Sequence, residues 1–101
     1  MYIIKKNKGL EDIICNNVTI VDCYAEWCGP CKLFRPIFES IEERFKTVKF
    51  CKLNVDDNKI LSKSLGVMSI PTIILFKEGK ELKRHIGYMD EDSLNEFIKD
   101  A

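Results

Sequence analysis

The segment from Val18 to Ala25 is almost continuously apolar and ends just before a Cys-Gly-Pro-Cys turn at residues 28–31. A strand that helices cover on both faces has this continuous apolar pattern. Beyond the turn, an apolar stripe at spacings of three and four predicts the longest helix; its members are Phe34, Phe38, Ile41 and Phe45. Pro36 lies inside this stripe and predicts a bend there rather than an end. The unit is typical of an α/β protein with a buried central strand.

Strand-like and helix-like segments alternate along the rest of the chain. Further strands are expected at 2–4, 48–55, 72–76 and 81–86, and further helices around 10–14, 60–65 and 94–98. Asp57 or Asn58 is expected to cap the helix around 60–65, and Asp90 the last one. The turn at 77–80 is short enough to force an antiparallel hairpin, whereas strands separated by helices should be parallel. The sequence therefore predicts a single mixed five-stranded sheet flanked by four helices.

Composition narrows the class of protein further. A chain of 101 residues with 46% hydrophobic and 32% charged residues is expected to fold as one domain, 1–101. Sixteen basic residues balance sixteen acidic ones without forming a basic stripe, which disfavours nucleic acid and membrane partners. No apolar run is long enough to span a bilayer, and Met1–Lys8 lacks the apolar stretch of a signal peptide, so we expect a cytoplasmic protein.

The two cysteines of the turn, Cys28 and Cys31, sit where a strand gives way to a helix. The start of a helix directs free N–H groups and partial positive charge at the first thiol, which favours a nucleophilic Cys28 thiolate. We expect Cys28 to be exposed and Cys31 buried. A zinc knuckle would need further ligands, but the chain has no second CxxC and only one histidine. A permanent structural disulfide across so small a loop would add little stability.

The segment Trp27-Cys28-Gly29-Pro30-Cys31-Lys32 resembles the active-site segment of the thioredoxin family. Other anchors of that family recur in order and spacing: Asp22, Pro36, 52–56, 70–72, Gly79 and Gly87. The resemblance covers essentially the whole chain. It implies the thioredoxin fold and a general protein-disulfide reductase, with no bound cofactor and no metal. Its redox group would be a Cys28–Cys31 disulfide, its partners a thioredoxin reductase and disulfide-containing client proteins, and its expected state a monomer.

The same resemblance assigns roles to individual residues. Cys28 would be the nucleophile, Cys31 the resolving thiol, and Asp22 a buried acid and base with Lys52 as its charge partner. Burial alone should raise the pKa of Asp22, and a purely structural acid paired with Lys52 is the alternative. Clients would bind an apolar collar around the cysteines, with a cis bond before Pro71; its members are Trp27, Gly29, Pro30, Ile70, Pro71, Gly87 and Tyr88.

Two other functions remain open for this sequence. A disulfide oxidase or isomerase would share the fold, although Gly29-Pro30 resembles the reducing branch of the superfamily. A non-catalytic binding subunit could use the same collar to hold a partner. The other three cysteines, Cys15, Cys23 and Cys51, are expected to be small buried hydrophobes. His85 is expected to be a solvated side chain on an edge strand.

Overall fold

The computed structural model describes all residues from 1 to 101. Its five strands form one sheet in the order β1-β3-β2-β4-β5, so β2 is central. The strands are β1 (Tyr2–Ile4), β2 (Val18–Tyr24), β3 (Val48–Asn54), β4 (Thr72–Lys77) and β5 (Lys80–Ile86). β3 runs parallel to β1 and β2, while β4 pairs antiparallel with β2 and β5. The predicted mixed five-stranded sheet and its terminal hairpin are confirmed.

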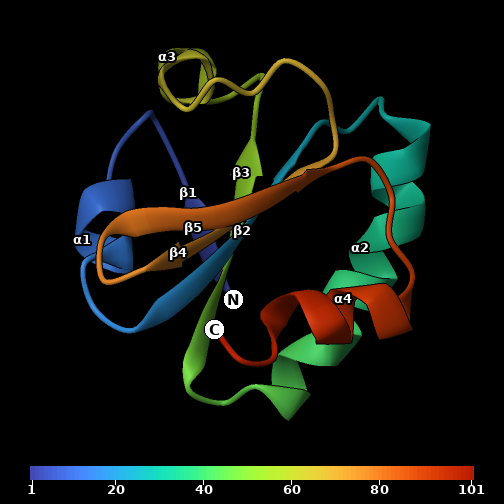
Figure 1. Cartoon of the computed structure of the whole chain (residues 1–101). Helices are drawn as coiled ribbons and strands as arrows, with labels where there is room; N and C mark the ends of the chain where they lie inside the picture. The colour runs from blue at the N-terminus through green and yellow to red at the C-terminus, as the bar shows by residue number, and fades with distance from the viewer.

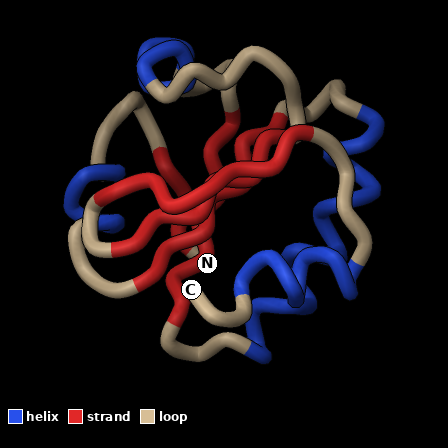
Figure 2. Tube along the Cα trace, in the orientation of Figure 1, coloured by secondary structure: helices blue, strands red, loops and turns tan.

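Four α-helices cover the two faces of this sheet. They are α1 (Leu10–Ile14), α2 (Gly29–Ile41), α3 (Lys59–Ser64) and α4 (Glu91–Ile98). Figure 1 shows α2 and α4 on one side of the strands and α1 and α3 on the other. The strands form the middle layer between them (Figure 2). No helix combines the length and the apolar character that crossing a bilayer requires.

Each face of the sheet carries its own apolar core. The larger one joins the sheet to α2 and α4 through Ile20, Phe34, Phe38, Ile41, Phe50, Ile73, Leu75, Met89, Leu94 and Ile98. The second joins the opposite face to α1 through Ile4, Leu10, Ile14, Val21, Cys23, Cys51, Leu53, Ile74 and Phe76, with Leu61 and Leu65 packed against it. Because side chains alternate along a strand, Asp22 shares the face of Ile20, which α2 covers.

The long helix differs in one detail from the prediction. It continues through Pro36, as expected, but ends at Ile41, and a 3₁₀ turn over Glu42–Arg44 follows. Such tighter turns are common at helix C-termini because they satisfy the last carbonyl groups. Phe45 therefore lies outside the helix, although its side chain still packs against the larger core.

Asn58 occupies the predicted cap position of α3 but its side chain does not cap the helix. It is buried, and its carboxamide bonds to three backbone groups: the amide of Asn7 and the carbonyls of Ile4 and Asn54. Asn7 also contacts α3, since its side-chain Oδ1 accepts a hydrogen bond of 2.9 Å from the amide of Leu61. Asn58 thus ties the end of β1 to the start of α3.

Candidate active site

The loop after β2 places Cys28 at the start of α2. Cys28 is the N-cap residue, with extended backbone at φ −85° and ψ 114°, and Gly29 opens the helix. Pro30 fits the first turn because the amides there have no partner inside the helix. The sequence Cys-Gly-Pro-Cys therefore brings the second cysteine back over the first within one helical turn.

Cys28 and Cys31 form a disulfide, with their Cα atoms 5.2 Å apart. The backbone amide of Cys31 donates a hydrogen bond of 3.2 Å to the Sγ of Cys28. The same amide, together with the positive end of the helix dipole, would stabilise negative charge on Cys28 Sγ once the disulfide is reduced. Of the two sulfurs, Cys28 is thus the better placed to be a thiolate.

Both cysteines are buried in this oxidised form, Cys28 with 4% and Cys31 with 2% of its surface exposed. The expectation that Cys28 is exposed is therefore wrong here. Residues near the end of β2 and in the loop before β4 cover the pair, and the Ile70 carbonyl oxygen lies 3.8 Å from the Cys28 sulfur.

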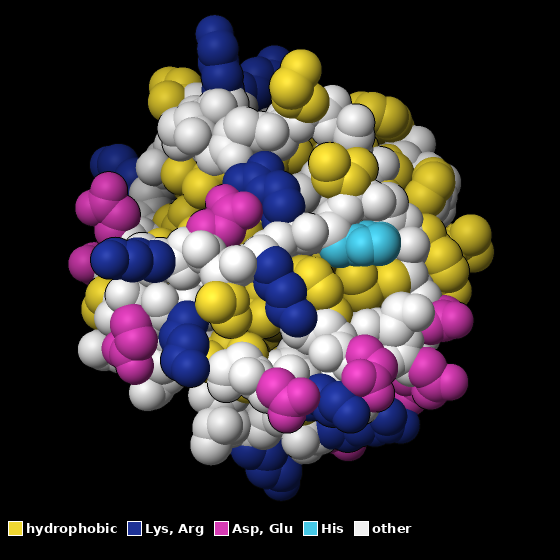
Figure 3. Space-filling view, viewed as in Figure 1, with side chains coloured by type: hydrophobic (Ala, Val, Ile, Leu, Met, Phe, Trp, Pro, Cys, Tyr) yellow, Lys and Arg dark blue, Asp and Glu magenta, His cyan; other side chains and the backbone are white.

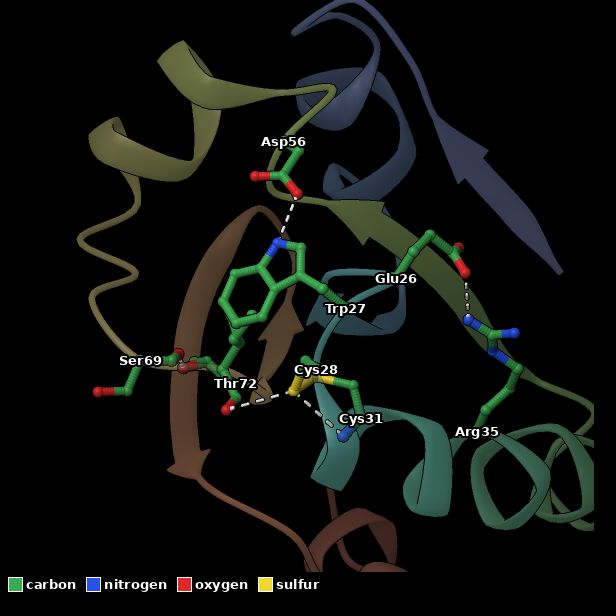
Figure 4. Close-up of a disulfide and its surroundings, with 9 residues drawn as sticks. Glu26, Trp27, Cys28, Cys31, Arg35, Asp56, Ser69 and Thr72 are labelled. Atoms are coloured by element: carbon green, nitrogen blue, oxygen red, sulfur yellow. Dashed lines mark hydrogen bonds and ion pairs between the residues drawn. A yellow bond between two sulfur atoms is a disulfide. The ribbon is translucent and has the colours of Figure 1, made fainter.

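The loop before β4 carries a cis peptide bond between Ile70 and Pro71. Gly87, which follows β5, donates its amide to the Pro71 carbonyl at 2.8 Å. Gly87 has φ 103°, a conformation that favours glycine. At the start of β4, directly after the loop, the hydroxyl of Thr72 donates a hydrogen bond to the Ser69 carbonyl (Figure 4). Three loops, those after β2, before β4 and after β5, therefore meet at the disulfide.

Trp27 projects from the first of these loops, with 69% of its surface exposed. Its indole Nε1 donates a hydrogen bond of 2.8 Å to Asp56 Oδ2, and Figure 4 shows the ring held beside the cysteine pair. Sequence reasoning did not single out Asp56 as a site residue. The only signal was its place in the segment 52–56, which carried part of the family resemblance.

Exposed apolar side chains flank the disulfide. They come from the three loops and from the end of β5: Trp27, Met68, Ile86 and Tyr88. Met68 is the most exposed, at 95%, and neither it nor Ile86 was predicted as part of the collar. Figure 3 shows apolar side chains gathered at the upper right, towards the start of α2, while most charged groups, of both signs, lie at the left and bottom of this face. Apolar surface of this kind marks binding sites.

Asp22 lies buried on the face of β2 that α2 covers, with 2% of its surface exposed. Its Oδ1 accepts no hydrogen bond. Burial raises the pKa of Asp22 from its ordinary value to about 7, while the charges of Lys52 and Arg35 pull it down. A carboxyl group with this pKa can take or give a proton near neutral pH.

Lys52 stands opposite Asp22 in the register of β2 and β3. Its ammonium, however, pairs with Glu39 of α2 at 2.8 Å and not with Asp22. Arg35, the second cation that acts on Asp22, is likewise held by another carboxylate, Glu26, at 3.2 Å (Figure 4). Sequence reasoning missed Glu39, Arg35 and Glu26, because no motif marks them.

The three remaining cysteines fall into two groups. Cys23 and Cys51 are buried, as expected, and burial raises the pKa of each thiol to about 12. The expectation is wrong for Cys15, which is exposed at the end of α1 with its thiol donating to the Asp12 carbonyl at 3.1 Å.

His85 is the only histidine of the chain and lies on the edge strand β5. The His85 ring is half-buried, edge-on to Phe97, so it is less solvated than expected. No three His, Cys, Asp or Glu side chains cluster closely enough to hold a metal ion, so a zinc knuckle at Cys28 and Cys31 lacks its ligand set.

The thioredoxin family model matches residues 2–100. The chain belongs to the thioredoxin family. Relatives named thioredoxin include one from Chlamydia caviae, 43% identical over 91 residues that cover 90% of this chain and 89% of the relative. Another, from Rickettsia felis, is 44% identical over 80 residues, which cover 78% of this chain and 76% of the relative.

Solved structures agree with this assignment. Mitochondrial thioredoxin 3 from Saccharomyces cerevisiae, in its oxidised form, superposes with a TM-score of 0.91 at 29% identity, over 100% of this chain and 95% of that one. The thioredoxin from Fasciola hepatica gives a TM-score of 0.90 at 33% identity, over 97% of this chain and 96% of that one. The expected thioredoxin fold is confirmed. The chain is a thiol-disulfide oxidoreductase whose redox group is its own cysteine pair, and it reduces disulfides by dithiol-disulfide exchange.

Proposed function

We propose that Cys28 is the nucleophile and Cys31 the resolving thiol of this exchange, acting on the disulfides of client proteins. The observation that carries the assignment is the Cys31 amide, which points at Cys28 Sγ from the first turn of α2. Only Cys28 occupies the N-cap position, where the helix dipole favours a thiolate. The two sulfurs are therefore unequal even though both are buried.

The reaction then proceeds in two exchanges. The Cys28 thiolate attacks a client disulfide, forms a mixed disulfide and releases the first client sulfur, which takes a proton from water. Cys31 gives its proton to the Asp22 carboxylate, and its thiolate attacks Cys28 Sγ. This step closes the Cys28–Cys31 disulfide and releases the second client sulfur as a thiolate, which is protonated in turn. Two electrons pass to the client, and the protein is left oxidised.

We assign Asp22 the acid and base role because it is buried, lies on the face that α2 covers, and has a pKa of about 7. A general base is most effective when its pKa lies near the working pH. Lys52 would tune this pKa from the neighbouring strand, since its positive charge favours the carboxylate.

The apolar collar would hold an extended client segment across the three loops. We propose that it includes the predicted residues together with the two that the sequence did not reveal: Trp27, Gly29, Pro30, Ile70, Pro71, Gly87 and Tyr88, with Met68 and Ile86. Pro71 is buried and Ile70 and Gly87 are half-buried, so they would shape the collar, while the exposed apolar side chains of Trp27, Met68, Ile86 and Tyr88 supply surface for contacts with many unrelated clients.

We also propose that residues 1–101 act as one domain and as a monomer, and that a thioredoxin reductase returns electrons to the Cys28–Cys31 disulfide. The cytoplasm is the proposed compartment. The chain has three free cysteines in addition to the redox pair, and a reducing compartment would keep such cysteines as thiols.

Insulin reduction with dithiothreitol as electron donor tests the roles of the two cysteines. Cys28→Ser should not exceed the uncatalysed rate. Cys31→Ser should also lose turnover but accumulate mixed disulfides with clients, visible on non-reducing gels and removed by dithiothreitol. Cys15→Ser, which alters an exposed thiol outside the pair, is the matched control and should retain full activity. Turnover by Cys28→Ser, or no adducts with Cys31→Ser, would contradict the assignment.

A measured reduction potential separates the reductase from the oxidase or isomerase. A reduction potential near that of reducing thioredoxins supports the reductase, and a strongly oxidising potential supports the oxidase or isomerase.

A further inference from the structure

Two cations influence the buried Asp22, and each is bound to a different carboxylate. The Lys52 ammonium lies 2.8 Å from Glu39, and the Arg35 guanidinium lies 3.2 Å from Glu26. Both cations also lie near the same aromatic ring, 5.8 Å and 5.7 Å from the Tyr24 centroid. Asp22 itself is left with an unpaired Oδ1.

Lys52 has two acidic groups within reach of its flexible stem. It is directly opposite Asp22 on the adjacent parallel strand, and neighbouring strands lie about 4.8 Å apart. An ammonium on a four-carbon chain can turn either towards Asp22 or towards α2. In the structure it turns to Glu39, whose side chain is half exposed. Binding there spares the ammonium the full desolvation that pairing inside the core would require.

We propose that Glu39 is a positioning residue for the resolving step. By binding the Lys52 ammonium it prevents an ion pair between Lys52 and Asp22, and so leaves the Asp22 carboxylate free to accept the proton of Cys31. The inference rests on the acid and base role proposed for Asp22. It adds a residue of α2 that touches neither the sulfurs nor Asp22.

The surroundings of Asp22 contain few other groups that could take over this control. Arg35 and Cys31 belong to α2, which covers it, and Lys52 stands on β3. On the β4 side its register partner is the apolar Ile73. Its own strand adds Tyr24 and the thiol of Cys23, which faces the opposite core. Lys52 and Arg35 are thus the two charges that can shift the protonation of Asp22.

Loss of the Glu39 charge should therefore transfer Lys52 to Asp22. An opposite charge at contact distance lowers the pKa of a carboxyl group by about 1–3 units. Glu39→Gln keeps the size and polarity of the side chain, so the fold should be unaffected. The expected result is a fall of about one unit or more in the Asp22 pKa, read from its side-chain ¹³C shift in the reduced protein during an NMR titration.

Three further variants make the test specific. Glu43→Gln removes an equal charge from the 3₁₀ turn, where Glu43 is exposed and forms no ion pair, and should leave the Asp22 pKa unchanged. Glu39→Asp keeps the carboxylate and should restore most of the wild-type value. In a Lys52→Met background, Glu39→Gln should have no further effect, because the ammonium it positions is absent.

The kinetic readout is the pH profile of the resolving step, measured as single-turnover decay of a preformed mixed disulfide. The acid limb of Glu39→Gln should move down in pH by the same amount as the Asp22 pKa. The proposal is overturned if the Asp22 pKa of Glu39→Gln equals that of Glu43→Gln, or if the shift persists in Lys52→Met. Failure of the underlying role looks different: Asp22→Asn would then resolve mixed disulfides at the wild-type rate at every pH.

Discussion

Trp27 and Asp56 are joined by a hydrogen bond of 2.8 Å between the indole Nε1 and the carboxylate, although 29 residues separate them in the chain. The bond links the loop after β2 to the segment after β3. Most of the indole is exposed to solvent, so packing alone would hold it loosely. Asp56 therefore fixes the orientation of the largest apolar side chain beside the disulfide.

Asp56→Ala should release this ring. The free energy of unfolding should fall by about 1 kcal/mol or less, since the bond is exposed. The KM for insulin should rise a few-fold, because a mobile indole must be ordered on binding. Trp27 is the only tryptophan, so its fluorescence anisotropy reports the change directly. Asp57→Ala, at the exposed neighbouring carboxylate, is the control, and equal anisotropy in both variants would contradict the role of Asp56.

The three unpaired cysteines should differ sharply in reactivity. Cys15 is exposed, whereas Cys23 and Cys51 are buried with a thiol pKa of about 12, so almost none of either is thiolate at neutral pH. Iodoacetamide should modify one cysteine of the oxidised native protein and three after denaturation, as counted by mass spectrometry. Cys15→Ser should reduce the native count to zero. Rapid labelling of Cys23 or Cys51 would show that the second core opens readily.

Local sequence patterns sufficed to predict the elements of the fold. The stripe of α2 has a helical period, the apolar run of β2 has the length of a strand and ends near a turn signal, and the turn at 77–80 has the length of a hairpin connection. The hairpin and the parallel strands then follow from the connections between them. The end of α2 was missed, because Phe45 keeps the apolar spacing although the backbone has already tightened into a 3₁₀ turn.

The site was predicted less completely, and for a physical reason. Its cysteines, Asp22 and the Ile70-Pro71 loop belong to a family motif. The partner of Lys52 does not: whether its ammonium meets Asp22 or Glu39 depends on a side-chain conformation and on burial, which only the three-dimensional arrangement decides. Asn58 is a similar case. Its position before α3 predicted a cap, but its side chain forms hydrogen bonds with the backbone at and after the end of β1 instead.

Asn58→Ala should destabilise the protein by about 3 kcal/mol, because it leaves the buried Ile4 carbonyl and the part-buried Asn7 amide and Asn54 carbonyl without this partner. Urea unfolding of the oxidised protein measures the effect. Asn16→Ala, at an exposed asparagine with no side-chain hydrogen bond, is the matched control and should change the stability by about 0.5 kcal/mol or less. A similar small change in Asn58→Ala would mean that water replaces the lost contacts.

Burial of Asp22 should make the protein less stable as the pH rises. Its pKa is about 7 in the folded protein and near 3.8 when unfolded, so between these values the folded state binds the extra proton. The free energy of unfolding therefore falls from about pH 4 to pH 7 and then levels off. A difference of about three pKa units corresponds to roughly 4 kcal/mol at the alkaline end.

Asp22→Asn removes this penalty, because the amide stays neutral at every pH. Relative to the wild type, the variant should be stabilised by up to roughly 4 kcal/mol at pH 8 and scarcely changed at pH 4, as measured by urea unfolding of the oxidised proteins. Asp57→Asn, at an exposed carboxylate, should leave the pH slope as it is. If Asp22→Asn and wild type lost stability in parallel from pH 4 to pH 8, Asp22 would have to ionise in the folded protein as readily as in water. The unpaired Oδ1 of this buried carboxyl group argues against this, because an ionised carboxylate there would lack hydrogen bonds that it makes to water when exposed.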